Sequence, residues 1–145
     1  MYRIVLTAMN SDPKIEPYVE TVGELFKTYE QTEIYMLRVM NDELSLLNEP
    51  DENNTPHTAV FIADLDGEHD AIIRLWDGDD YRDVSYYDIY EVSTDEETYY
   101  KYRGFWILKE ESYFTIEQYD TSLARTEILE DAFLWIDDLL LAMSK

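Results

Sequence analysis

The residues most able to do chemistry lie in one segment, from Asp64 to Asp83, which reads "DLDGEHDAIIRLWDGDDYRD". It holds eight acidic residues, one histidine and two Asp-Gly pairs. Carboxylates bind divalent cations, and carboxylates and imidazole transfer protons in catalysis. The segment therefore raises three alternatives: a metal site, a catalytic cluster or a negatively charged surface.

The spacing of these residues argues against a metal site. A calcium-binding EF-hand loop needs alternating acids, then glycine at position 6 and glutamate at position 12. A loop beginning at Asp64 has glycine at position 4 and leucine at position 12. The two histidines, His57 and His69, are twelve residues apart, and the chain has no cysteine, so no zinc motif is present. We expect neither a metal ion nor a cofactor.

Motifs for covalent or phosphate chemistry are not found either. The four scattered glycines form neither a G-x-S-x-G nucleophile elbow nor a phosphate-binding loop. Paired catalytic carboxylates follow no spacing rule, so a chain with 33 acids is certain to bring some pair together. That pairing carries no information, and we expect a protein that is not an enzyme.

Charge is the strongest signal in the sequence. The chain has 33 acidic and 11 basic residues, a net charge of −22. Residues 41–100 contain 18 acids and only two bases, Arg74 and Arg82, which is −16 of that total. Such a field repels nucleic acid and anionic membranes, and it attracts a basic protein with a fast, salt-sensitive association. We therefore expect a basic protein partner, with no direct binding to nucleic acid or membrane.

Alternating apolar residues and turn signals predict an α+β fold, in which an antiparallel meander of about five or six strands has its helices packed on one face. The length of 145 residues fits a single domain spanning residues 1–145. Turns are expected at Asp66-Gly67, at the "DGDD" run and at Glu110-Glu111. The strands are expected at residues 2–10, 58–65, 69–76, 81–92, 98–110 and 112–119.

One element in the first half of the chain has two interpretations. Thr21 and Glu24 have capping-box spacing, which predicts a helix opening at Thr21. Residues 32–48 are either a continuation of this helix, broken near Gln31 or Asn41, or a buried strand, and the apolar spacing favours the helix. The following stretch, Asn48 to His57, contains two prolines and three asparagines, which predicts a loop.

The chain ends in a predicted helix with Thr126 as its N-cap and acidic residues in its first turn. Its apolar residues cover more than half of the circumference. Such a helix either covers the sheet or contributes part of its surface to a homodimer contact.

Acidic and tyrosine side chains interleave along the central strands and turns. Rigid strands would hold the carboxylates at defined separations, and tyrosine is favoured at interfaces because it combines contact area with a hydrogen bond. We predict a partner-binding surface made of Asp64, Asp66, Glu68, Asp70, Asp77, Asp79, Asp80, Asp83, Tyr86, Asp88, Tyr90, Glu91, Asp95, Glu96 and Glu97.

In this composition the chain resembles the DNA-mimic proteins that phages and plasmids use against host restriction or CRISPR enzymes. It also resembles the acidic immunity proteins that neutralise basic nuclease toxins. The resemblance implies an inhibitor that blocks a basic nucleic-acid-handling enzyme. The alternative is an acidic adaptor or assembly domain, or a toxin-immunity protein, with an apolar helix-mediated interface. The lack of cysteine and of a secretory signal pattern fits a cytoplasmic location.

Overall fold

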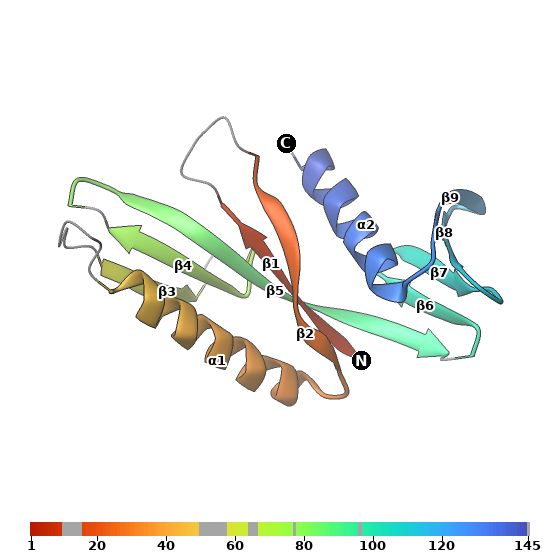
Figure 1. Ribbon diagram of the computed structural model, residues 1–145, viewed down its shortest axis with the longest axis horizontal. Coiled ribbons are helices and arrows are strands. Elements are labelled where there is room, and N and C mark those ends of the chain that lie inside the picture. Colours follow the sequence, from red (N-terminus) through yellow and green to blue (C-terminus); the bar gives the residue numbers. More distant parts are fainter. Residues whose placement is uncertain (10–15, 50–57, 64–66, 77, 96, 145) are drawn as a thin grey trace.

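The structure is a computed structural model that describes residues 1–9, 16–49, 58–63, 67–76, 78–95 and 97–144. These residues form one antiparallel sheet of nine strands and two helices (Figure 1). The predicted α+β class is confirmed, with more strands than the five or six expected. In chain order the elements are β1 Tyr2–Ala8, β2 Tyr18–Phe26, α1 Tyr29–Leu47, β3 Thr58–Ala63, β4 Ala71–Trp76, β5 Tyr81–Asp95, β6 Tyr99–Tyr102, β7 Phe105–Lys109, β8 Phe114–Gln118, β9 Thr121–Thr126 and α2 Leu129–Met143.

The long strand β5 joins the two halves of the sheet. Its first half pairs with β4, and residues 85–91 pair with β1, which in turn pairs with β2. Its last four residues pair with β6, which begins the meander β6-β7-β8-β9. Figure 1 shows β5 running from the α1 half of the molecule to the α2 half. Side chains on β5 therefore belong to both halves.

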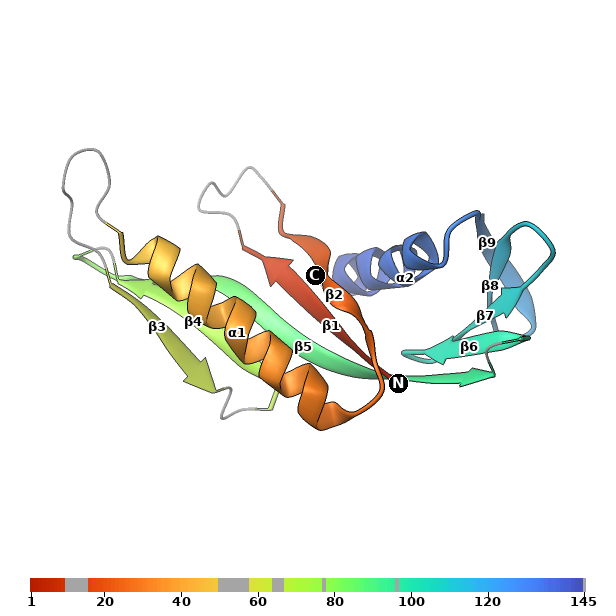
Figure 2. The same cartoon turned by 60° about the horizontal axis from the view of Figure 1, so that its bottom comes forward.

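The two helices pack against opposite faces of β1. Ile4 lies in one apolar cluster with Met36 and Met40 of α1, whereas Arg3 is hydrogen-bonded to Asp137 of α2. Successive side chains of a strand point to opposite faces. Figures 1 and 2 show α1 beside the β1–β5 half and α2 toward the β6–β9 half. The prediction that the helices pack on one face of the sheet is therefore not confirmed.

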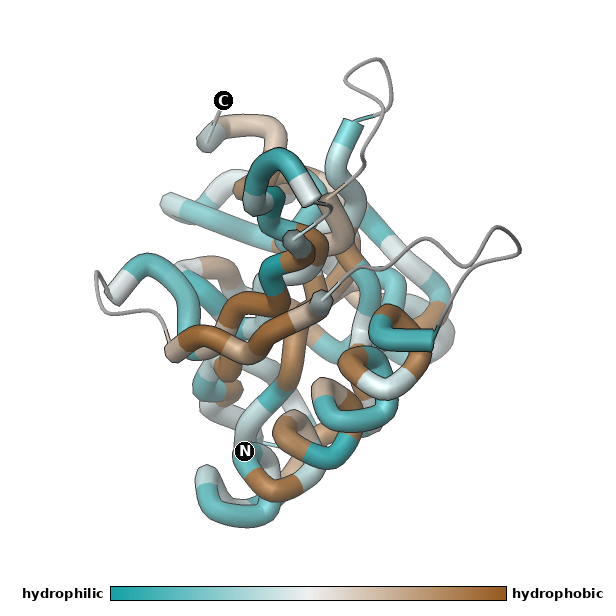
Figure 3. Tube along the Cα trace, turned by 90° about the vertical axis from the view of Figure 1, so that its left-hand side faces the viewer, coloured by the Kyte–Doolittle hydropathy of each residue, from teal (hydrophilic) through white to brown (hydrophobic). Residues whose placement is uncertain are grey.

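Each helix closes its own apolar core. Met36 and Met40 of α1 pack against residues of β1–β5, including Ile73 and Tyr87, while Phe133 and Ile136 of α2 pack with residues of β5–β8. In Figure 3 hydrophobic segments run through the centre of the trace and most hydrophilic segments lie around it. The two cores meet at β5, where the strand passes from one helix to the other.

The segment predicted to open the first helix is instead the strand β2. Tyr2 pairs with Phe26 and Ile4 with Val22, so three residues of β2 lie opposite Arg3 in a bulge. Gly23, in this bulge, has φ +73°, and a Cβ there would lie 2.8 Å from the ring of Tyr35. A bulge needing a glycine, with α1 packed close against it, is a tertiary feature that the capping-box spacing does not reveal.

Helix α1 is continuous from Tyr29 to Leu47, which resolves residues 32–48 as helix without a break at Gln31 or Asn41. Its N-cap is Thr28, whose hydroxyl accepts a hydrogen bond from the Gln31 N–H at 3.2 Å. Asn48 is its C-cap, and residues 50–57 of the predicted loop lie outside the described part.

Two tight turns account for strands that the sequence did not separate. Arg103 and Gly104, with φ of 50° and 87°, turn the chain between β6 and β7. Tyr119 and Asp120, with φ of 53° and 61°, do the same between β8 and β9. Two consecutive residues at positive φ form a type I′ hairpin turn, whose usual signal is Asn-Gly or Asp-Gly. The Tyr-Asp turn lacks that signal, so the strand after it was missed.

The remaining boundary predictions hold in part. Gly67 and Gly78 have φ of +78° and +105°, as expected for turns flanking β4, although Asp66 and Asp77 lie outside the described residues. The turn at Glu110 is confirmed by its N–H donating to the Tyr113 carbonyl at 2.9 Å. Thr126 is not the N-cap of α2: it ends β9, and Ile128 takes the N-cap position without a side-chain hydrogen bond.

Candidate functional site: carboxylates along β5 and a charged pocket

The predicted partner-binding residues follow β5 and its flanking turns rather than forming one patch. β5 has 15 residues, and at about 3.3 Å per residue it spans roughly 50 Å. Asp64, Asp66, Asp77 and Glu96 lie outside the described part of the chain. The others form a group at the start of β5 (Asp79, Asp80, Asp83), a middle group (Glu68, Asp70, Tyr86, Asp88, Tyr90) and a group at its end (Glu91, Asp95, Glu97).

Seven of these acidic residues are exposed, and several fix the local backbone. The carboxylate of Asp70 accepts a hydrogen bond from the Ile89 N–H at 2.7 Å, and Asp80 accepts one from the Tyr81 N–H at 2.8 Å. These bonds orient one carboxylate beside the middle of β5 and one at its start. The exposed set is Glu68, Asp70, Asp79, Asp80, Glu91, Asp95 and Glu97.

Asp83 is part of an internal ion pair. Its carboxylate accepts hydrogen bonds from Arg74 Nε and from the Tyr86 hydroxyl, both at 2.7 Å. Burial raises the pKa of Asp83, but the two hydrogen bonds together with the charges of Arg74 and His69 outweigh burial, and the net pKa is lowered. Its charge is already matched by Arg74, so it adds less to the outer field than predicted.

Asp88 is buried, with 6% of its surface exposed, which corrects its prediction as a surface residue. One carboxylate oxygen lies 2.9 Å from Nδ1 of His69, and the other accepts the Asp70 N–H at 3.2 Å. Burial raises the pKa of Asp88, and the contact with His69 only partly offsets this rise. The His69 ring stacks on Tyr86, with ring centroids 4.1 Å apart and planes 5° from parallel.

Tyr90 also packs inside rather than presenting its ring to a partner. The guanidinium of Arg103 lies over its ring, 3.9 Å from the centroid. Burial raises the pKa of Tyr90 to about 12, with a further contribution from the charge of Asp88. Tyr86 is similar: burial and its bond to Asp83 raise its pKa to about 12. The described contacts of these two partly buried tyrosines are with other residues of the fold, Arg103 for Tyr90 and Asp83 for Tyr86.

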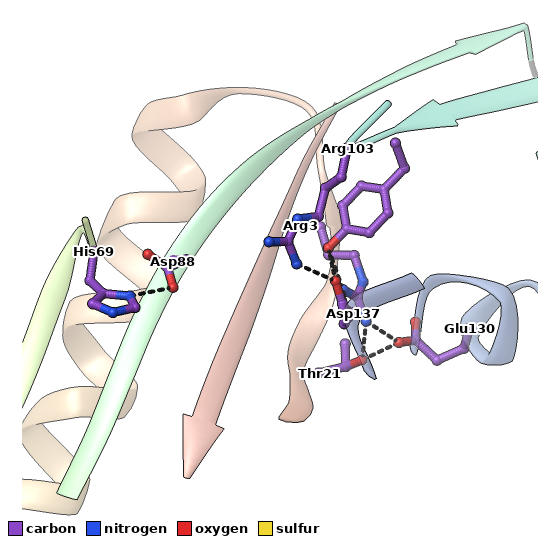
Figure 4. Close-up of polar contacts among 8 residues, drawn as sticks. Arg3, Thr21, His69, Asp88, Arg103, Glu130 and Asp137 are labelled. Carbon is purple, nitrogen blue, oxygen red and sulfur yellow. Dashed lines mark hydrogen bonds and ion pairs between the residues drawn. The ribbon is translucent and has the colours of Figure 1, made fainter. Parts of the chain in front are cut away.

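Asp88, His69 and Tyr90 line a cavity of about 210 Å³. Arg103 and Asp137 complete its polar wall, and the remaining wall is formed by Val5, Thr7, Val19, Glu68, Leu140, Leu141 and Ser144. The cavity thus lies between the last turns of α2 and the strands β1, β2 and β5. Figure 4 shows the His69–Asp88 pair on one side and the cluster around Asp137 on the other.

The cluster around Asp137 was not predicted from the sequence. Arg3, 1% exposed, packs beside the rings of Tyr102 and Phe133, with its guanidinium 5.3 Å and 5.1 Å from their centroids. It donates to Asp137, and to Glu130 at 2.8 Å. Further bonds from Arg3 reach the Tyr102 hydroxyl at 2.8 Å and the hydroxyl of Thr21 at 2.6 Å, and Thr21 also contacts Glu130.

Asp137 receives two more donors. The Tyr102 hydroxyl donates to it at 2.6 Å, and Arg103 Nη1 lies 3.0 Å away. A signal for this cluster is present in the sequence: Arg3 is a single base in an apolar strand, and Asp137 is an acid in an apolar helix. A charge in such a setting is costly unless it is paired, so the sequence indicates that each needs a partner but does not say which residue that partner is.

The described residues bring together no group of three metal-ligating side chains. Neither described helix is long and apolar enough to cross a membrane. Comparison of the chain with protein-family models, curated proteins and solved structures found no match. The chemistry of this region is therefore argued from its own geometry: fixed carboxylates along β5 and a small charged pocket beside α2.

Proposed function

We propose that this protein is a non-enzymatic inhibitor that binds a basic, nucleic-acid-handling protein through its acidic surface. The observation that carries the proposal is a net charge of −22 on a fold that holds exposed carboxylates near both ends of a 15-residue strand. Restriction and CRISPR enzymes are the partner class we favour, with the inhibitor acting as a DNA mimic. A cytoplasmic location and a role in phage counter-defence belong to the same proposal.

The physical support comes from how a fixed array of charge binds. Duplex DNA carries about one negative charge per 1.7 Å of its axis, so proteins that hold it expose long basic channels. A strand spanning roughly 50 Å can present carboxylates over a long path, and carboxylates fixed on a strand need little ordering on binding. Three arginines (Arg3, Arg74, Arg103) are engaged in internal ion pairs, so they do little to mask the outer acids.

The alternative, an adaptor or assembly domain with a homodimer contact through α2, has weaker support. Helix α2 packs its Phe133 and Ile136 into the core, and the most exposed large apolar side chains near its ends are Ile128 and Met143. A toxin-immunity protein remains close to the main proposal, because a basic nuclease toxin presents the same charge pattern as a host nuclease.

The test is binding to purified restriction endonucleases, a CRISPR effector and a basic nuclease toxin, with duplex DNA as competitor. Binding is expected to be displaced by DNA and to weaken steeply between low and physiological salt. A complex that forms equally well at high salt, or alongside bound DNA, contradicts the mimic.

Matched charge variants locate the surface. The quadruple variant D79N/D80N/D95N/E97Q removes four exposed charges at the two ends of β5, and the control E33Q/D42N/E110Q/E127Q removes four exposed charges elsewhere. The first is expected to slow association by about tenfold or more, and the control by only a few-fold. Equal effects from both sets contradict a binding surface along β5.

A further inference from the structure

We infer that the pocket between α2 and the sheet receives one lysine or arginine side chain of the basic partner. The inference rests on the proposed function, because it names a contact that such a partner makes. It follows from the size, the lining and the charge of the pocket.

Size selects a single side chain. Cofactors and drug-sized ligands occupy cavities of about 300–1,000 Å³. The volume of this pocket, about 210 Å³, lies below that range. It therefore suits a single slender side chain rather than a nucleotide or a comparable cofactor.

The lining matches the two ends of a basic side chain. Val5, Val19, Leu140 and Leu141 give an apolar wall, and Glu68 and Asp88 place carboxylates at the same cavity. Lysine and arginine carry an apolar stem and a charged head, and they pack the stem on apolar surface while the head reaches polar groups.

The charge of the pocket favours a cation. In the cluster on its inner side, Arg3 and Arg103 face Asp137 and Glu130, so two positive charges balance two negative ones. The two other carboxylates, Glu68 and Asp88, share the pocket with His69. Two carboxylates and one imidazole leave a net negative charge whether or not the imidazole is protonated.

Two further features act in the same direction. Leu141 and Ser144 at the pocket belong to the C-terminal end of α2, whose last turn has no basic residue. The carbonyl groups at a helix C-terminus carry a partial negative charge that favours cations. Burial, and the nearby charge of Asp70, also raise the pKa of Asp88, so a cation beside it would relieve an existing electrostatic cost.

The test uses the isolated protein and N-acetyl-L-arginine methylamide, a capped arginine, followed by NMR titration of backbone amides and the His69 ring. Saturable shifts are expected at Val5, His69, Asp88 and Leu141. The capped citrulline analogue, which has the same shape without the charge, is expected to bind at least about tenfold more weakly, because it lacks the charge-assisted contact. Equal binding of the two compounds overturns the inference.

Three variants locate the binding. Asp88→Asn keeps the shape of the buried side chain, and Glu68→Gln changes an exposed residue that does not threaten folding. Both are expected to weaken binding of capped arginine by about tenfold. The control Asp95→Asn removes the same charge from the exposed end of β5, with an expected change below about twofold. Similar losses in all three variants would show attraction to the overall charge and overturn the pocket.

The outcome separates this inference from the proposed function. Capped arginine bound at the pocket, without capture of any nucleic-acid enzyme, supports the pocket and counts against the proposed partner class. Capture of such an enzyme with no binding of capped arginine supports the proposed function and overturns the pocket.

Discussion

Two buried aspartates, Asp137 and Asp88, line the same cavity, but their surroundings differ. Asp137 is bound by Arg3, Arg103 and the Tyr102 hydroxyl, so cationic and hydroxyl donors surround it. Asp88 has one imidazole contact and one backbone N–H. The carboxylate of Asp137 thus joins four elements of the fold through cationic and hydroxyl donors, whereas the described contacts of Asp88 are an imidazole and a backbone N–H.

The Asp137 cluster joins the two N-terminal strands to β6 and to the C-terminal helix. Arg3 lies on β1, Thr21 on β2, Tyr102 on β6 and Asp137 on α2. Buried ion pairs contribute little net stability compared with apolar residues of the same size, but removing one partner is costly because the other is left unpaired. This asymmetry makes the cluster the most sensitive part of the fold.

The largest expected effect is therefore the loss of Arg3. Arg3→Met keeps the approximate volume but leaves Asp137 and Glu130 without their main cation, and we expect a loss of about 3–5 kcal/mol in the free energy of unfolding. Urea denaturation followed by circular dichroism measures this loss. The double variant Arg3→Met/Asp137→Leu is expected to recover part of the loss, because both charges are then removed. A double variant that is less stable by the sum of the two single effects contradicts this account.

A smaller loss is expected when only the outer donor of Asp137 is removed. Arg103 is partly exposed, and Arg103→Gln leaves Asp137 with Arg3 and Tyr102. We expect a loss of about 1–2 kcal/mol in the free energy of unfolding. The same variant uncovers the ring of Tyr90, so tyrosine fluorescence is expected to change as well. Lys101→Gln, in the preceding strand β6, is a suitable control, because Lys101 contacts the ring of Trp106 and lies outside the cluster. A loss as large as that of Arg3→Met would place the main compensation of Asp137 on Arg103.

Removing the charge of Asp88 is expected to change the free energy of unfolding much less than removing Arg3. Asp88→Asn retains an acceptor for the Asp70 N–H and offers an amide to His69 Nδ1, while it removes a buried charge. At neutral pH we expect a change within about 1 kcal/mol in the free energy of unfolding. The pKa of Asp88 is raised in the folded state, so the folded wild type binds this proton more tightly than the unfolded chain does. The wild type therefore loses stability as pH rises from the ordinary pKa of an aspartate towards the raised pKa of Asp88. Urea denaturation between pH 4 and pH 7 is expected to show this loss in the wild type but not in the variant. A loss of several kcal/mol at pH 7 contradicts the distinction between the two aspartates.

The sequence predicts the fold elements around these two aspartates better than it predicts the surroundings of the aspartates themselves. Local patterns predict the antiparallel sheet and the turns at Gly67, Gly78 and Glu110, and they favour helix over strand for residues 32–48, because those features depend on neighbouring residues. β2 was missed because its bulge depends on packing between Gly23 and Tyr35. Asp88 was expected on the surface because strand alternation assigns a face but does not say which distant residues, such as His69, pack over it. The acidic composition was visible at once, but which acids are neutralised by arginine depends on contacts between residues far apart in the chain.

The smallest expected effect concerns a third carboxylate, that of the partly buried Glu43, which lies in the α1 half of the molecule. It accepts a hydrogen bond from the Ser85 hydroxyl at 2.9 Å, and burial raises its pKa, with hydrogen bonds from Ser85 and Tyr87 offsetting part of the rise. If Glu43 resembles Asp88, the folded protein favours its protonated form, and the wild type loses stability as pH rises above about 4.5, the ordinary pKa of the group. Glu43→Gln is then expected to be as stable as the wild type near pH 4 and slightly more stable at pH 7.

The control for Glu43 is the exposed neighbour Asp42→Asn, which removes one charge from the same helix without changing a buried group. Its effect is expected to stay nearly constant between pH 5 and pH 7, apart from the general relief of charge repulsion. If the two variants follow the same pH profile, the raised pKa of Glu43 has no consequence for stability. The contrast between Asp137, which is paired with arginine, and Asp88, whose described contacts are an imidazole and a backbone N–H, would then be limited to the pocket beside α2.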